Sequence, residues 1–169
     1  MSSERDQQLV VDDAAAQQAS PMCVSILVFK GEPLDYQRHR HTALSFRPLF
    51  VENPDGSAGN TLVVHITGPP GELGFQVWDK YDASQDLGRT LVKDVLVGTL
   101  RKETTKSEVV QLLAGVPIEN SDREFNCQTW VEKGMRLLRE MEWLSEEEVE
   151  QGLDCMIDCI LEAEEEPEG

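Results

Sequence analysis

The chain is organised around the sequence Asn126-Cys127-Gln128-Thr129-Trp130-Val131, which follows a turn-forming run and opens a helical pattern. Apolar residues recur from this point at spacings near three and four: Trp130, Met135, Leu137, Leu138 and Met141. A cysteine in the first turn of a helix lies beside unpaired N–H groups and the positive end of the helix dipole, which favour its thiolate. Cys127 is therefore a candidate nucleophile if a histidine reaches it. Taken alone, it is more typical of a small buried residue.

Length and composition indicate one globular domain in a reducing compartment. The chain has 169 residues, and its hydrophobic fraction of 40% is ordinary for a protein with a core. No apolar run approaches the roughly 20 residues of a membrane span, and the N-terminus has no basic-then-apolar signal pattern. The four cysteines are too few and too irregularly spaced for a disulfide framework. We expect a soluble cytoplasmic protein.

The net charge of −17 is unevenly distributed. Residues 140–169 contain thirteen acidic side chains and no Lys or Arg, so the rest of the chain is close to neutral. Binding to nucleic acid is disfavoured because no basic face offsets this charge. Repulsion between the acidic C-terminal region and anionic lipids likewise argues against a membrane partner.

The order of the expected elements is strands first and helices afterwards. Strands are expected at 23–29, 41–47, 60–66 and 75–78, an ambiguous segment lies at 91–97, and helices are expected at 107–114, from 127 and from 145. This order predicts an α+β protein with a mostly antiparallel sheet of about four to six strands packed against helices. We expect a disordered segment at 1–20, one domain at 21–163 and an acidic tail at 164–169 that frays.

Two histidines fall at one end of an expected hairpin. If 41–47 and 60–66 pair as one antiparallel hairpin, His41 lies opposite Ile66 and His65 lies opposite Thr42. Both imidazoles would then lie at the same edge of the sheet. Together with Cys127 at a helix start, they supply a thiol nucleophile, a general base and an orienting group.

Three segments carry a family resemblance: HTAL at 41–44, LVVH at 62–65 and NCQTWV at 126–131. In this order they resemble the permuted papain-like thiol hydrolases and acyltransferases, in particular lecithin:retinol acyltransferase and its relatives; a similar layout occurs in uncharacterised fungal proteins. The resemblance covers residues 24–140. It implies a permuted papain-like fold in which His41 is the base, His65 orients it and Cys127 forms an acyl-thioester.

The sequence departs from that family in ways that affect the substrate. The turn at 48–60 is longer, the residues after the cysteine differ, and an acidic helix replaces a hydrophobic C-terminal anchor. We therefore expect a hydrolase or acyltransferase acting on an amide, ester or thioester of a soluble small molecule or peptide. The alternative is a non-catalytic interaction module that binds partners through its acidic C-terminal helix.

Other candidate residues are weaker. No cofactor or metal is expected, because Cys155 and Cys159 lie one helical turn apart without a second ligand pair and are more typical of helix packing. His39 is more typical of a surface residue. Gln76 either donates to an oxyanion or alternates outward. The oligomeric state is open.

Overall fold

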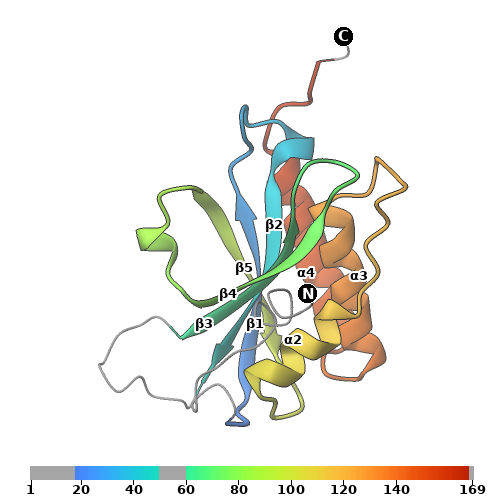
Figure 1. Cartoon of the computed structure of the whole chain (residues 1–169). Helices are drawn as coiled ribbons and strands as arrows, with labels where there is room; N and C mark the ends of the chain where they lie inside the picture. Colours follow the sequence, from blue (N-terminus) through green and yellow to red (C-terminus); the bar gives the residue numbers. More distant parts are fainter. Residues whose placement is uncertain (1–17, 50–59, 168–169) are drawn as a thin grey trace, which may run out of the picture.

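The computed structural model describes residues 18–49 and 60–167, which form an antiparallel sheet packed against helices (Figure 1). The described strands are β1 (Met22–Phe29), β2 (His41–Pro48), β3 (Thr61–Thr67), β4 (Gly74–Tyr81) and β5 (Leu91–Thr99). The described helices are α2 (Lys106–Ala114), α3 (Cys127–Glu140) and α4 (Glu146–Leu161), with short 3-10 turns η2 (Gln37–His39) and η3 (Ala83–Gln85). The five strands are ordered β4-β3-β2-β1-β5, and every neighbouring pair is antiparallel. The predicted α+β class is confirmed, and the ambiguous segment at 91–97 is the edge strand β5.

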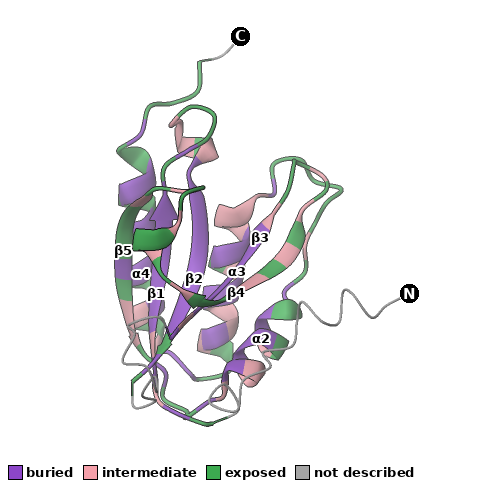
Figure 2. Ribbon diagram, turned by 60° about the vertical axis from the view of Figure 1, so that its left-hand side comes forward, coloured by how far each residue is buried: buried purple, intermediate pink, exposed green. Residues whose placement is uncertain are grey.

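The central strands β1, β2 and β3 are buried on both faces (Figure 2). On one face the helices cover the main core, to which α3 contributes Trp130, Met135 and Leu138. A smaller cluster covers the other face. Its members are Leu27, Phe29, Ala43 and Val63, with Trp78, Tyr81 and Leu91 packed against them. The centre of the sheet is therefore buried between two apolar clusters, and it supports the residues at the ends of its strands.

Side-chain caps define where α3 and α4 begin. The Asn126 side chain accepts hydrogen bonds from the N–H groups of Gln128 and Thr129, so α3 begins at Cys127. Ser145 and Glu148 form the predicted capping box at the start of α4. Asn and Ser are unfavourable inside helices and favourable at their ends, because their short side chains hydrogen-bond to nearby backbone groups.

The predicted register of the hairpin is wrong by one residue. The structure pairs Leu44 with Val64, where the prediction required Leu44 opposite Val63. Because side chains alternate between faces, the predicted register would have put His41 and His65 on opposite faces of the sheet. The observed register puts both on the face of the smaller cluster. Residues 50–59 of the connection lie outside the described residues.

The segment after α4 returns to the residues that precede β2. Glu164 forms an isolated parallel bridge with Tyr36, and its carbonyl accepts a hydrogen bond of 2.9 Å from the Gln37 N–H. The sequence predicts fraying from Glu164 onward, but these contacts hold the segment against η2. The disordered lead-in expected at 1–20 lies outside the described residues, except for 18–20. None of the described helices is both long and apolar enough to cross a bilayer.

Candidate active site

His41 and His65 form a direct imidazole pair. Nε2 of His41 lies 2.8 Å from Nδ1 of His65, and the two rings are tilted at 72° with their centroids 4.9 Å apart. His41 is the first residue of β2 and His65 lies near the end of β3, so the hairpin register brings them together. Since Nε2 of His41 is engaged, Nδ1 is the ring nitrogen left for another group.

Aromatic side chains enclose the pair. The His65 ring packs on Trp78 with centroids 4.0 Å apart, and the His41 ring lies 5.7 Å from that of Phe29. Burial lowers the pKa of His41 to about 2 and that of His65 to about 3, and the charge of Arg89 adds to both shifts. Both imidazoles are therefore neutral at neutral pH. Nε2 of His65 is buried and has no hydrogen-bond partner among the described residues.

The first turn of α3 is tied to the loop that leads into β2. The side-chain N–H₂ of Gln128 donates to the carbonyl of Gln37 at 2.9 Å and to that of Arg40 at 3.1 Å. Arg40 is itself buried, forms an ion pair of 2.9 Å with Asp35, and donates to the Cys159 carbonyl at the end of α4. These contacts fix the start of α3 beside the start of β2.

Cys127 lies at this junction and is half-buried. Its sulfur lies 3.8 Å from the Arg40 carbonyl. Burial raises the pKa of the Cys127 thiol, while the backbone N–H and hydroxyl of Thr42 lower it by a smaller amount. The expectation that the helix start favours the thiolate is thus outweighed by desolvation in the resting state. The Thr42 hydroxyl is buried and makes no hydrogen bond of standard geometry with a described residue.

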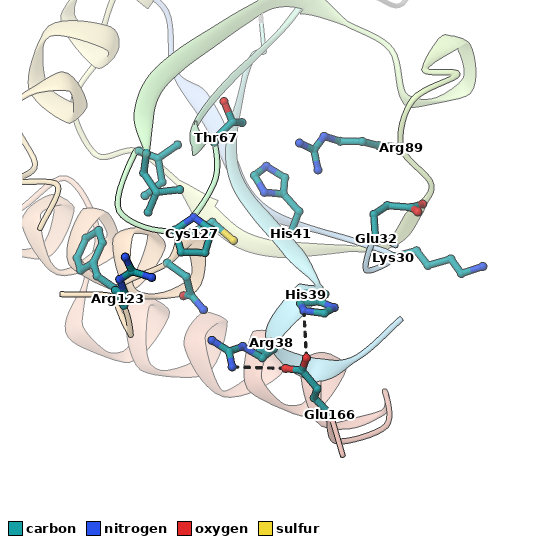
Figure 3. Close-up of a pocket in the computed structure, with 16 residues that line it drawn as sticks. Lys30, Glu32, Arg38, His39, His41, Thr67, Arg89, Arg123, Cys127 and Glu166 are labelled. Carbon is teal, nitrogen blue, oxygen red and sulfur yellow. Dashed lines mark ion pairs between the residues drawn. The ribbon is translucent and has the colours of Figure 1, made fainter. Parts of the chain in front are cut away.

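Cys127 and His41 line one cavity of about 480 Å³. In Figure 3 the Cys127 sulfur points toward the side of the cavity where His41 lies. His65 does not line the cavity and is placed behind His41 by the hydrogen bond between them. The structure therefore brings the three residues singled out in the sequence into one cluster, with two of them accessible to a ligand.

Three further residues of the cluster were missed by sequence reasoning: Thr42, Arg89 and Gln128. Thr42 follows His41 directly, but its hydroxyl becomes relevant only through the approach of α3. Arg89 lies in the segment between β4 and β5, belongs to no motif, and reaches toward His41 in Figure 3. Gln128 was noted only as a departure from the family pattern, and its contacts with the loop before β2 depend on the tertiary packing of α3.

Of the other candidate residues, only His39 lines the cavity that contains Cys127. His39 is half-buried, lines the cavity, and lies 3.9 Å from the carboxylate of Glu166. Gln76 is exposed and does not line this cavity. Cys155 is exposed and Cys159 is buried. Within the described residues, no group of three His, Cys, Asp or Glu side chains is arranged to hold a metal ion.

Comparison with known proteins adds no relative: no protein-family model, no curated protein and no solved structure matches the chain. The resemblance to the permuted papain-like enzymes stays a prediction.

Proposed function

We propose that this protein is a cysteine-dependent hydrolase or acyltransferase that forms an acyl-thioester on Cys127. One observation carries the proposal: His41 is held by His65 through Nε2, and it lines the same cavity as Cys127. A nucleophile, a base and a group that orients the base are the parts that thiol catalysis requires. The substrate is an amide, ester or thioester of a soluble small molecule or peptide.

In the proposed reaction, His41 moves one proton in each half. Nδ1 of His41 accepts the Sγ proton of Cys127 as the sulfur attacks the substrate carbonyl. The proton then passes to the leaving group as the carbon–heteroatom bond breaks and the acyl-thioester remains. In the second half His41 accepts a proton from water or from an acceptor alcohol or amine, whose attack releases the acyl group and restores the thiol.

His65 orients His41 through its Nδ1. For Nδ1 of His41 to accept a proton, its Nε2 has to carry one and donate it to Nδ1 of His65. His65 then carries its own proton on Nε2, which is buried and has no hydrogen-bond partner among the described residues. The hydrogen bond between the rings fixes these tautomers, because the nitrogen that donates it must carry the proton and the nitrogen that accepts it must not.

The oxyanion of the tetrahedral intermediate needs donors near Cys127. Asn126 caps the N–H groups of Gln128 and Thr129 but not that of Cys127. The Cys127 N–H, in the first turn of α3, is therefore available to the oxyanion.

The order of the three residues along the chain supports our inference of a permuted papain-like fold. The two histidines come from early strands, and the cysteine begins a later helix.

Intact-mass analysis after treatment with an electrophilic acyl probe, such as a 4-nitrophenyl ester, tests the proposal. Wild-type protein should gain one acyl group, Cys127→Ala should gain none, and Cys155→Ala should behave as wild type because Cys155 is exposed and outside the cavity. Equal labelling of wild type and Cys127→Ala would refute acyl-enzyme formation. The interaction-module alternative would then take its place.

A further inference from the structure

The cavity that holds Cys127 and His41 is lined by more basic than acidic side chains. The basic residues are Lys30, Arg38, Arg89 and Arg123, and the acidic residues are Glu32 and Glu166. This is the reverse of the whole chain, whose net charge is −17. An excess of one sign of charge in a cleft attracts ligands of the opposite sign.

Most of these cations are not used to hold the fold together. Arg38 pairs with Glu166 at 3.4 Å. Lys30, Arg89 and Arg123, by contrast, form no ion pair with any residue that the structure describes. In other parts of the described structure basic side chains do form ion pairs, for example Lys106 with Asp79 and Arg101 with Glu148.

Arg89 is the best placed of the unpaired cations. Its guanidinium lies 5.8 Å from the centre of the Trp78 ring, and Trp78 packs on His65. Its backbone N–H donates to the Asp86 carboxylate at 3.1 Å, and the same carboxylate accepts from the Tyr81 hydroxyl at 2.8 Å. These contacts hold the turn that carries Arg89 in place. The Arg89 side chain is half-buried, and its guanidinium extends toward His41 (Figure 3).

We propose that the substrate carries a carboxylate or phosphate group, which Arg89 binds in the cavity beside His41. The inference rests on the proposed acyl-transfer function and narrows its substrate class. A guanidinium can bind either group through two parallel hydrogen bonds, which also fixes the orientation of the acyl carbonyl. Lys30 and Arg123, which are exposed at the cavity, add attraction without a fixed geometry.

Binding an anion at Arg89 has a second consequence for the reaction. The charge of Arg89 opposes protonation of both His41 and His65. A bound carboxylate or phosphate compensates this charge, so His41 accepts the Cys127 proton more readily when an anionic substrate is present. The substrate thereby supplies part of the activation of its own nucleophile.

Alkylation by iodoacetate and by iodoacetamide tests the inference without requiring turnover. Both reagents join the thiolate sulfur to carbon as iodide leaves, and they differ mainly in the carboxylate. The ratio of their rates at Cys127 is divided by the same ratio for N-acetylcysteine amide, a thiol without charged neighbours, which cancels the intrinsic difference between the two reagents. We expect a normalised ratio of about three or more, since one charge at about 6 Å has that effect in water.

The variants make the test specific. Arg89→Gln should lower the normalised ratio by about threefold, the contribution of one charge, whereas Arg47→Gln, which removes a charge from the exposed far end of β2, should leave it unchanged. Raising the salt concentration should lower it. A ratio near one in wild type, or a high ratio that survives Arg89→Gln, overturns the inference even if the acyl probe labels Cys127. Conversely, loss of acyl labelling with a high ratio overturns the proposed function and leaves an anion site.

Protection experiments separate the two anions. Inorganic phosphate or succinate is added at constant ionic strength, and the rate of Cys127 alkylation by iodoacetamide is followed. The anion that changes the rate at the lower concentration in wild type, and not in Arg89→Gln, identifies the recognised group. Slower alkylation means that the anion blocks the reagent, and faster alkylation means that it activates the thiol. If neither anion changes the rate, the inference fails.

Discussion

At the residue scale, burial leaves the thiol and the imidazole both uncharged in the resting site. The pKa of Cys127 is raised and that of His41 is lowered, each chiefly by desolvation. A thiolate–imidazolium pair is therefore not preformed, and in the proposed reaction proton transfer accompanies attack on the substrate. Sequence reasoning identified the residue types but predicted the opposite shift for the thiol, because the helix dipole can be read from the sequence and the desolvation cannot.

The first prediction separates the roles of the two histidines. His41→Ala should reduce acylation by the probe as much as Cys127→Ala does, because residues that act as one unit are not additive. His65→Gln keeps a hydrogen-bonding group beside His41 and should retain partial activity. Single-turnover acylation rates measure both effects.

The double variant His41→Ala/His65→Ala serves as the control for that experiment. It should be no slower than His41→Ala alone, since an orienting group has no role without the base. If His65→Gln is as inactive as His41→Ala, His65 has a role beyond orientation.

A second prediction concerns Cys127 itself. Because burial raises the pKa of its thiol, alkylation of the free protein by iodoacetamide should require a higher pH at Cys127 than for N-acetylcysteine amide, an unburied thiol. Rate profiles between pH 6 and 10, measured by mass spectrometry of peptides for the protein, give both midpoints. A lower midpoint at Cys127 would mean that the helix dipole outweighs desolvation.

The buried histidine pair also predicts how stability depends on pH. In the unfolded chain each histidine has a pKa near about 6.5, whereas burial lowers it to about 2 for His41 and about 3 for His65. Below about pH 6.5 the unfolded state binds more protons, so the free energy of unfolding falls as the pH falls. The slope should approach about 1.4 kcal/mol per pH unit for each histidine.

Urea denaturation between pH 6.5 and 5 measures this slope while few carboxylates titrate. His65→Gln removes one of the two titrating groups and should have a shallower slope than wild type. Identical slopes would show that the pair takes up protons in the folded state.

At the scale of elements, the sequence predicted the starts of the helices correctly but not the pairing of the strands. The starts of α3 and α4 follow from their capping residues, which act on their own helix ends. The register of β2 on β3 failed by one residue, because an alternating pattern fixes the faces only when one face is polar, and the described part of both strands is buried on both sides. Arg89 escaped notice because tertiary packing, not sequence spacing, places it at the cavity.

A fourth prediction tests the hydrogen bonds between the start of α3 and the loop before β2. Gln128→Ala removes the two hydrogen bonds to the carbonyls of Gln37 and Arg40, so the start of α3 should shift relative to His41. We expect acylation to slow by about tenfold, because small misplacements of reacting groups are costly, and stability to fall by about 1 kcal/mol. Acylation rates and urea denaturation give the two values.

Gln111→Ala is the matched control, since Gln111 is exposed on α2. It makes the same change in a helix that does not line the cavity, and it should leave the acylation rate unchanged. Equal effects of the two substitutions would show that the contacts of Gln128 do not position Cys127.

At the scale of the whole molecule, the acidic C-terminal region and the basic cavity meet. Composition predicts the acidic region but not its path, because the contacts of Glu164 with Tyr36 and Gln37 are backbone contacts that no side-chain pattern encodes. The same segment carries Glu166 to the cavity, where its carboxylate lies near Arg38 and His39 (Figure 3). An acidic tail thus reduces the positive charge at the cavity and weakens its attraction for anions.

The last prediction follows from that placement. Glu166→Gln should speed alkylation of Cys127 by iodoacetate by about twofold relative to iodoacetamide, because the exposed pair with Arg38 is screened by water and salt. Glu165→Gln, an exposed neighbour that does not line the cavity, should leave the ratio unchanged. Truncation after Ala163 should give the same increase and also lose about 1 kcal/mol of stability with the Glu164 hydrogen bond. If truncation alters stability but not the ratio, the tail supports η2 without affecting the charge that a ligand encounters.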